Sequence, residues 1–165
     1  IAKFAAAGKR AGKKDLGLIA MSYKNVYVGR VAMGANDAQT LKVFQEAEAH
    51  NGPSLIIAYC PCINHGFDLN SQLSHQKMAV DSGYWPLLRY NPALAAEGKA
   101  PLVLDSKKPT IPVAEYIYTE NRYKALTRSN PKVAKALADD LQKEVDARFA
   151  FYEAMSKDTE GLISL

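Results

Sequence analysis

An uninterrupted apolar run within Ser54–Cys60 constrains the fold more than any other segment of the sequence. Its central residues, from Leu55 to Ala58, are apolar without alternation. A strand with one wet face alternates apolar and polar residues, whereas a strand of a helix-covered parallel sheet is apolar on both faces. The sequence therefore predicts a strand buried on both faces of a sheet at this position.

The segments before this strand follow a repeating order of helix and strand. Apolar residues at helical spacing predict a helix over Asp15–Lys24. The β-branched segment Val26–Ala32 predicts a strand. With a second helix between the two strands, this order is typical of a doubly wound α/β domain. We expect an α/β fold with part of a doubly wound, mainly parallel sheet, followed by C-terminal helices.

The second helix has clear predicted ends. Asn36 is a favourable N-cap, and Gln39 three residues later completes a capping-box pattern. The helix should end near His50–Pro53, because Gly52 and Pro53 both terminate helices. Its expected apolar face consists of Leu41, Phe44 and Ala47.

The rest of the chain predicts one more helix, two short strands and then helices only. Asn130 and Pro131 suit the N-cap and first residue of the final helix, which carries an apolar stripe for docking onto the domain. The predicted elements are a helix over Leu73–Ser82, strands over Trp85–Tyr90 and Leu102–Leu104, and a helix over Val113–Arg128. Pro86, near the start of the first of these strands, predicts either an edge strand or a position at the entry to the strand. The stripe comprises Leu137, Leu141, Val145, Phe149 and Tyr152.

Composition excludes several classes of protein. Of 165 residues, 48% are hydrophobic and 23% charged, as in ordinary globular domains rather than disordered chains. No apolar run approaches the roughly 20 residues that span a bilayer, so no membrane segment is expected. Residues 1–14 hold five Lys and Arg and no acid. This basic start predicts an anion contact or a solvated segment; nucleic-acid binding would need basic residues that recur through the fold.

One short segment combines residues that carry chemistry. The octapeptide Tyr59–Gly66 reads Tyr-Cys-Pro-Cys-Ile-Asn-His-Gly and directly follows the predicted buried strand. Ligands of open α/β sheets bind at the carboxyl ends of strands, so this loop lies where a site is expected. The Cys62 thiolate could ligate iron or zinc, or act as a nucleophile.

Spacing alone leaves the role of Cys62 open. A lone thiol is often a small buried apolar group, and a complete tetrahedral metal site needs about four ligands. Cys60, Cys62 and His65 would supply three, at a spacing uncommon for zinc. Two cysteines so close together do not readily form a disulfide with each other, which favours a reducing compartment.

The sequence resembles a known family in four blocks that occur in the same order. They are AKFAAAGKRAGKKDLGLIAMSY, VYVGRVAMGANDAQTLKVFQEAE, GPSLIIAYCPCINHG and SGYWPLLRYNP. All four are similar to the C-terminal region of pyruvate:ferredoxin (flavodoxin) oxidoreductase, and the resemblance runs from Ala2 to about Met155. The resemblance implies that residues 1–110 are the second half of a thiamine-diphosphate-binding α/β domain. Residues 111–165 would be a helical segment packed on that domain, and the whole would be a fragment of a larger multidomain chain.

The resemblance also implies an activity and cofactors for the parent enzyme. Enzymes of the family oxidatively decarboxylate pyruvate to acetyl-CoA and CO₂ with thiamine diphosphate, Mg²⁺ and [4Fe–4S] clusters. The electrons pass to ferredoxin or flavodoxin, or to NADP through a fused reductase. Implied partners are therefore pyruvate, coenzyme A, the electron acceptor, the remaining domains and a second subunit of a homodimer, in the cytoplasm or an organelle. The G-D-G motif for the diphosphate would lie upstream of Ile1, so no catalytic or thiamine-binding residue is expected in this fragment.

One site residue is carried over from the family. The Cys of its Y-x-x-C-I-x-x-G loop is a ligand of the [4Fe–4S] cluster nearest the thiamine, and the matching residue is Cys62. Cys₄ ligation would leave three ligands to come from another region of the parent. Cys60 is interpreted as a bystander. Asn64 and His65 are candidates for contacts that tune the cluster potential, or for capping the loop. The alternative function is a stand-alone metal-binding or interaction module without catalysis.

Overall fold

The computed structural model describes residues 12–159. Most of the predicted basic start lies outside this range, and of its basic residues only Lys13 and Lys14 are described. The elements of the first half are α1 (Leu16–Met21), β1 (Tyr27–Val31), α2 (Asp37–Ala49), β2 (Ser54–Ala58), η1 (Ile63–His65), η2 (Leu69–Ser71) and α3 (Gln72–Asp81). The second half contains β3 (Leu88–Tyr90), α4 (Ala93–Ala96), β4 (Leu102–Leu104), α5 (Val113–Ile117), α6 (Asn121–Ser129) and α7 (Pro131–Met155).

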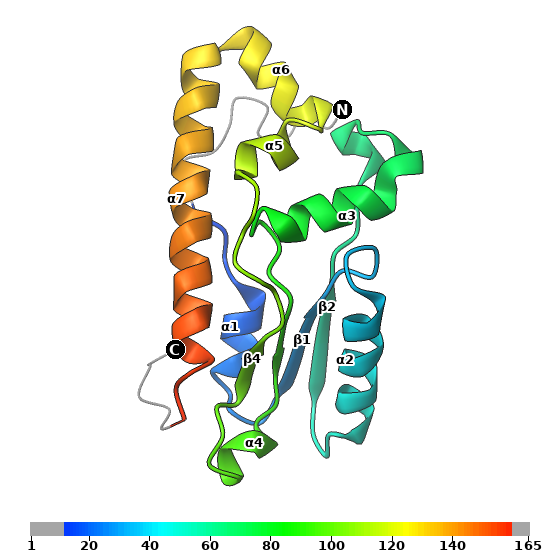
Figure 1. The fold of residues 1–165 in the computed structure, drawn as a ribbon, viewed down its shortest axis with the longest axis vertical. Coiled ribbons are helices and arrows are strands. Elements are labelled where there is room, and N and C mark those ends of the chain that lie inside the picture. Colours follow the sequence, from blue (N-terminus) through cyan, green and yellow to red (C-terminus); the bar gives the residue numbers. More distant parts are fainter. Residues whose placement is uncertain (1–11, 160–165) are drawn as a thin grey trace.

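The predicted α/β fold class is confirmed. The four described strands form one sheet in the order β2-β1-β3-β4. β1 and β2 pair in parallel, and β3 pairs antiparallel with both β1 and β4. β1, β2 and β4 therefore run in one direction and β3 in the other, which makes the sheet mixed. Figure 1 shows the sheet with the long helix α7 along one side and α2 along the other.

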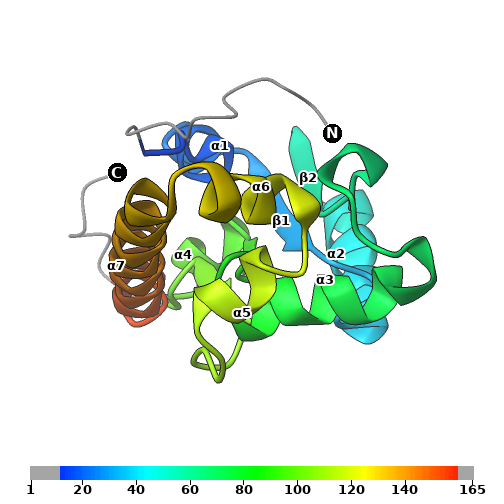
Figure 2. The ribbon, with the colours of Figure 1, turned by 90° about the horizontal axis from the view of Figure 1, so that it is seen from above.

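Two layers of helices cover the sheet on opposite faces. Residues of α1 and α7 pack with Val28 of β1 in one core cluster, and Val43 of α2 packs with Tyr27 and Val31 in another. Figures 1 and 2 both place α1 and α2 on opposite sides of the β1–β2 pair. Gly29 permits the close approach of α2, because a Cβ at that position would lie 2.3 Å from Val43 Cγ1. A third cluster joins α3, α5 and α7 beyond the carboxyl ends of the parallel strands.

The apolar run at Ser54–Cys60 forms a strand, but the predicted burial on both faces is wrong for the described residues. β2 lies at one edge of the described sheet, with its central residues half-buried and its two ends exposed. β1 is instead the strand that is buried throughout. Conversely, β3 lies between β1 and β4, so of the two positions predicted from Pro86 the edge is wrong and the entry to the strand is confirmed. Pro86 does not disturb β3, because the strand begins two residues later, at Leu88.

For α2, the predicted N-cap is confirmed but most of the predicted apolar face is not buried. Asn36 caps α2 as expected, with its side-chain oxygen accepting from the Gln39 N–H at 2.9 Å. However, Leu41 and Phe44 are exposed, and the buried face of α2 carries Gln39 and Val43. Gln39 is buried because its side-chain amide donates to the carbonyl of Arg30 and to the carboxylate of Asp105. The inward face of α2 therefore combines the hydrogen-bonded Gln39 with Val43 and with Ala47, the one predicted apolar residue that packs there.

The helix predicted over Val113–Arg128 is two helices, α5 and α6. The break falls at Tyr118–Glu120, where Glu120 has an extended backbone and acts as the N-cap residue of α6. Its side chain is buried against two histidines, and a continuous helix does not provide this turn. The final helix agrees with the prediction: Asn130 caps it, and Val145, Phe149 and Tyr152 of the stripe are buried. No helix within residues 12–159 is long and apolar enough to cross a bilayer.

Candidate functional site

The loop that follows β2 presents Cys62 to solvent. Cys62 has an extended backbone at the N-terminus of η1, and its side chain is exposed. Cys60 is also exposed, with its thiol 3.8 Å from the carbonyl oxygen of Pro61. Both thiols are free, so either is chemically accessible at the carboxyl end of β2. This is the edge of the sheet at which open α/β folds bind ligands.

Gly66 ends η1, and at this residue the loop packs closely against the start of α6. Its φ of 73° lies in the left-handed region that glycine adopts without cost. Its carbonyl oxygen accepts a hydrogen bond from the Asn121 N–H at 3.1 Å. A Cβ at Gly66 would lie 2.9 Å from the Cβ of Asn121, so only glycine fits this contact without a shift. The glycine therefore sets the distance between the Cys62 loop and α6.

His65 turns into the protein and anchors the loop. Its Nδ1 lies 2.7 Å from Glu120 Oε2, and its Nε2 lies 2.9 Å from a guanidinium nitrogen of Arg122. Both ring nitrogens are thus engaged, which leaves neither free to coordinate a metal ion together with Cys60 and Cys62. Asn64, by contrast, is exposed on the outside of the loop. The structure separates the residues of the octapeptide: the thiols face outward and the imidazole faces inward.

Glu120 joins the loop to the core, and the sequence analysis did not identify it. Its residue is 1% exposed, and its second carboxylate oxygen lies 2.9 Å from His75 Nε2 on α3. The ring of Phe67 stacks on that of His75 with centroids 4.4 Å apart. A buried charged carboxylate is costly unless it is paired, and here two imidazoles and the Tyr116 hydroxyl surround it. Glu120 lay inside a predicted helix, so the sequence carried no signal for this role.

A pair of tyrosines extends this polar cluster to the end of β2. The hydroxyls of Tyr59 and Tyr116 contact each other, and Tyr116 Oη lies 3.5 Å from Glu120 Oε1. Burial raises the pKa of Tyr59 and of Tyr116 well above the ordinary tyrosine value, so both hydroxyls keep their protons. The residue directly after β2 is therefore held through hydrogen bonds to the same buried carboxylate as His65.

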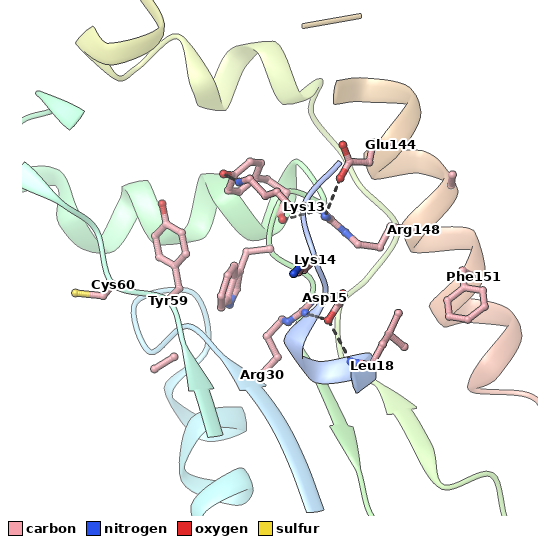
Figure 3. A pocket seen from close by; sticks show the side chains of 14 residues that line it. Lys13, Lys14, Asp15, Leu18, Arg30, Tyr59, Cys60, Glu144, Arg148 and Phe151 are labelled. Atoms are coloured by element: carbon pink, nitrogen blue, oxygen red, sulfur yellow. Dashed lines mark hydrogen bonds and ion pairs between the residues drawn. The ribbon is translucent and has the colours of Figure 1, made fainter. Parts of the chain in front are cut away.

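A pocket of about 670 Å³ opens beside the same strand ends. It is lined by residues of α1, α7, β1 and the segment after β2, including Tyr59 and Cys60 (Figure 3). Cys60, interpreted from the sequence as a bystander, thus lines a cavity, whereas Cys62 is not among the lining residues. Arg30 on β1 also lines the pocket and was the one charged residue in an otherwise apolar predicted strand. A charged side chain in an apolar strand indicates that a group of opposite charge lies beside it.

The partner of Arg30 is Asp15, the N-cap of α1. A guanidinium nitrogen of Arg30 lies 2.6 Å from Asp15 Oδ1, and Tyr152 of α7 donates to Oδ2 of the same carboxylate. Burial by itself would raise the pKa of Asp15, but the charge of Arg30 and the donated hydrogen bonds together lower it. Lys13, which also lines the pocket, contacts the Tyr84 hydroxyl, and burial lowers the pKa of its ammonium group. The Asp15–Arg30 ion pair and the Tyr152 hydrogen bond therefore link α1, β1 and α7 at the pocket.

Within residues 12–159, no group of three or more His, Cys, Asp or Glu side chains is placed to hold a metal ion.

No family model matches the chain. However, several curated proteins align with nearly the whole of this chain. The chain is 55% identical over 156 residues to the pyruvate-flavodoxin oxidoreductase of Trichormus variabilis. It is 48% identical over 157 residues to the pyruvate:ferredoxin oxidoreductase of Moorella thermoacetica, and 46% identical over 157 residues to the mitochondrial pyruvate dehydrogenase [NADP(+)] of Euglena gracilis.

The chain matches a fragment of pyruvate-flavodoxin/ferredoxin oxidoreductase. Each of these alignments covers 94–95% of this chain but only 9–13% of the relative's length. The relatives confirm the family that the four sequence blocks indicated. Within the described part of this fragment, the free thiols and the pocket lie together at the carboxyl ends of the parallel strands.

Proposed function

We propose that this fragment supplies one thiolate ligand, Cys62, to a [4Fe–4S] cluster of a pyruvate oxidoreductase. The observation that carries the proposal is the exposed thiol of Cys62 on a loop anchored from behind. The anchors are the His65–Glu120 pair and the hydrogen bond between Gly66 and Asn121. A soft thiolate is the ligand that iron–sulfur clusters use, and Cys₄ ligation allows the other three to come from elsewhere in the parent.

The residues of this fragment would hold the cluster and orient it. Cys62 would bind one iron, while the inward-facing His65 would keep the loop at a constant distance from α6. A cluster bound there would carry single electrons away from the oxidation of pyruvate. The exposed Asn64 is the loop residue available for contacts that tune its potential, and His65 would act through the loop rather than on the cluster. The sequence of this fragment contains no diphosphate-binding G-D-G motif, so we assign none of its residues to thiamine diphosphate.

The proposed parent is a cytoplasmic homodimer that converts pyruvate and coenzyme A to acetyl-CoA and CO₂. It passes electrons to flavodoxin or ferredoxin, the acceptors in the names of the relatives. Residues 1–110 would be the second half of its thiamine-diphosphate-binding domain, and residues 111–165 the helical segment that packs on it. Within the described residues, α7 packs against β4 and α1, which supports a C-terminal helical segment docked on the α/β part.

The test compares Cys62→Ser with Cys60→Ser in the full-length enzyme. An alkoxide is a poor replacement for a soft thiolate, so Cys62→Ser should lose the iron of one cluster and its reduced-state EPR signal. Pyruvate-dependent reduction of the acceptor should collapse, while decarboxylation survives better. Cys60→Ser should keep the iron content and acceptor reduction of the unaltered enzyme. Full cluster content in Cys62→Ser, or cluster loss in Cys60→Ser, would contradict the assignment of the ligand to Cys62.

A further inference from the structure

The buried polar cluster behind the Cys62 loop determines where individual protons lie. Its side chains come from η1, α3, the turn between α5 and α6, and the first turn of α6, which Figure 1 shows in the upper half of the molecule. They are those of His65, His75, Thr119, Glu120 and Arg122. A hydroxyl donates one hydrogen bond, a guanidinium only donates, and a carbonyl oxygen only accepts. These roles decide which nitrogen of each imidazole carries a proton.

Arg122 holds His65 as a neutral ring. A guanidinium nitrogen of Arg122 lies 2.9 Å from His65 Nε2, and this nitrogen can only donate. His65 Nε2 must therefore accept, which places the single proton of the neutral ring on Nδ1. That nitrogen lies 2.7 Å from Glu120 Oε2. One oxygen of Glu120 thus faces an N–H group of the Cys62 loop.

Thr119 determines the protonation of His75 in the same way. Its hydroxyl donates to the main-chain carbonyl oxygen of Tyr116 at 2.7 Å, which uses its only proton. Thr119 Oγ1 also lies 3.2 Å from His75 Nδ1 and must accept there, so Nδ1 carries a proton. On the other side of the ring, His75 Nε2 lies 2.9 Å from Glu120 Oε1. A proton must lie between these two atoms, because two lone pairs at that distance would repel each other.

The surroundings of the two groups favour this proton on the imidazole. Donors that face a carboxylate stabilise its charged form, and Glu120 has the Nδ1–H of His65 at Oε2 and the Tyr116 hydroxyl 3.5 Å from Oε1. His75 stacks on Phe67 with ring centroids 4.4 Å apart and lies 5.0 Å from the Tyr116 ring. Aromatic faces attract cations. An imidazolium and a carboxylate therefore neutralise each other in a site where both residues are buried.

The other titratable groups around Glu120 bring no second negative charge. Burial raises the pKa of four phenols, which therefore keep their protons; they are those of Tyr59, Tyr84, Tyr116 and Tyr123. Lys13 attracts Glu120 at longer range, and Arg122 places a positive charge beside His65. Among these groups, the proton of His75 is thus the one whose loss would leave Glu120 without its closest positive charge.

We propose that His75 is an imidazolium that holds Glu120 in place and, through Glu120, the loop that carries Cys62. Loss of the Nε2 proton sets a lone pair of the ring against the carboxylate, so Glu120 moves away and its contact with His65 breaks. A group that is protonated in the folded protein stabilises it at low pH, and this contribution is lost as the pH rises. The loop therefore opens more often at alkaline pH. His75 is a positioning residue, and the inference holds whether or not Cys62 binds a cluster.

The first experiment determines the charge of His75 in the full-length enzyme. Solid-state ¹⁵N spectra of enzyme labelled at histidine, recorded with and without the His75→Gln substitution, identify the His75 signals by difference. Both ring nitrogens should be protonated near neutral pH, and Nε2 should lose its proton as the pH is raised. An unprotonated nitrogen in His75 near neutral pH would overturn the proposal, and this result does not depend on how the variant folds at high pH.

The second experiment measures amide hydrogen exchange over residues 62–66 of the full-length enzyme across the same pH range, corrected for the intrinsic pH dependence of exchange. The corrected rate should rise about tenfold as His75 loses its proton, the factor expected for one charge-assisted hydrogen bond. His75→Gln should remove this rise, because its side-chain NH₂ group donates at every pH. His50→Gln, at a histidine that contacts the Asn25 carbonyl, is the control and should keep it. A rise that persists in His75→Gln, or that is absent from the unaltered enzyme, would overturn the proposal.

Discussion

His65 Nδ1 lies 2.7 Å from Glu120 Oε2, and this contact ties the loop that carries Cys62 to the interior of the protein. Glu120 is fully buried and also lies 2.9 Å from His75 Nε2, so one carboxylate links the loop to α3. The next residue along the chain, Asn121, donates to Gly66 and closes the same loop from the other end. The exposed thiol thus rests on a buried, charge-assisted network, and buried networks of this kind restrict the motion of the groups they hold.

Replacing Glu120 with Gln should loosen the Cys62 loop. The amide keeps the shape of the carboxylate but loses the charge-assisted contact with His65, which is worth about one factor of ten in a local opening equilibrium. Amide exchange over residues 62–66 of the full-length enzyme should rise by roughly tenfold. Glu97→Gln is the matched control, because Glu97 pairs with Lys99 at 2.7 Å in an exposed position. Equal exchange in the two variants would show that Glu120 does not hold the loop.

Replacing Gly66 with Ala should destabilise the protein more than replacing Gly98. Both glycines have a positive φ, 73° and 69°, so alanine suffers similar backbone strain at each. Only at Gly66 does the new Cβ meet a neighbour, the Cβ of Asn121 at 2.9 Å; nothing lies within 4 Å of it at Gly98. The additional overpacking should cost about 1–3 kcal/mol. Thermal unfolding midpoints measure the difference, and equal shifts would contradict the close contact.

The close approach of α2 to β1 predicts a non-additive pair of substitutions. Gly29→Ala places a Cβ 2.3 Å from Val43 Cγ1, which should cost about 1–3 kcal/mol of stability. Val43→Ala removes that methyl and leaves a cavity of its own. Because the two changes compensate in volume, the double variant should be more stable than the sum of the single effects predicts. Chemical denaturation of all four proteins measures the coupling, and simple additivity would argue against this packing.

Asp15 should make the stability of this domain depend on pH in the acid range. Its pKa is lowered in the folded state, so the unfolded state binds its proton more readily. Its contribution is therefore complete above the unfolded pKa of about 4 and is lost as the pH falls through the lower folded value. Asp15→Asn should remove this part of the acid-induced loss, as seen in denaturation midpoints between pH 7 and 3. Asp139→Asn, at an exposed pair with Lys135, is the control and should leave the profile unchanged.

Patterns within a few residues of sequence correctly predicted the helix caps, one helix end and one apolar helix face. The Asn36 and Asn130 caps, the termination near Gly52 and the docking stripe of α7 all agree with the structure. These features follow from hydrogen bonds and apolar spacing within a few residues, which a single sequence displays directly. The family resemblance likewise rested on local blocks, and the relatives confirm it.

Tertiary contacts decided what those patterns left open. On the inward face of α2, Gln39 contacts Asp105, 66 residues away. At the break before α6, Glu120 contacts two histidines on other elements. No local spacing encodes either contact. The sequence by itself determined the α/β class, the family and the position of Cys62 after a strand. Only the tertiary structure decided that the Cys62 side chain faces outward while His65 turns inward, because that choice depends on a buried carboxylate 55 residues further along the chain.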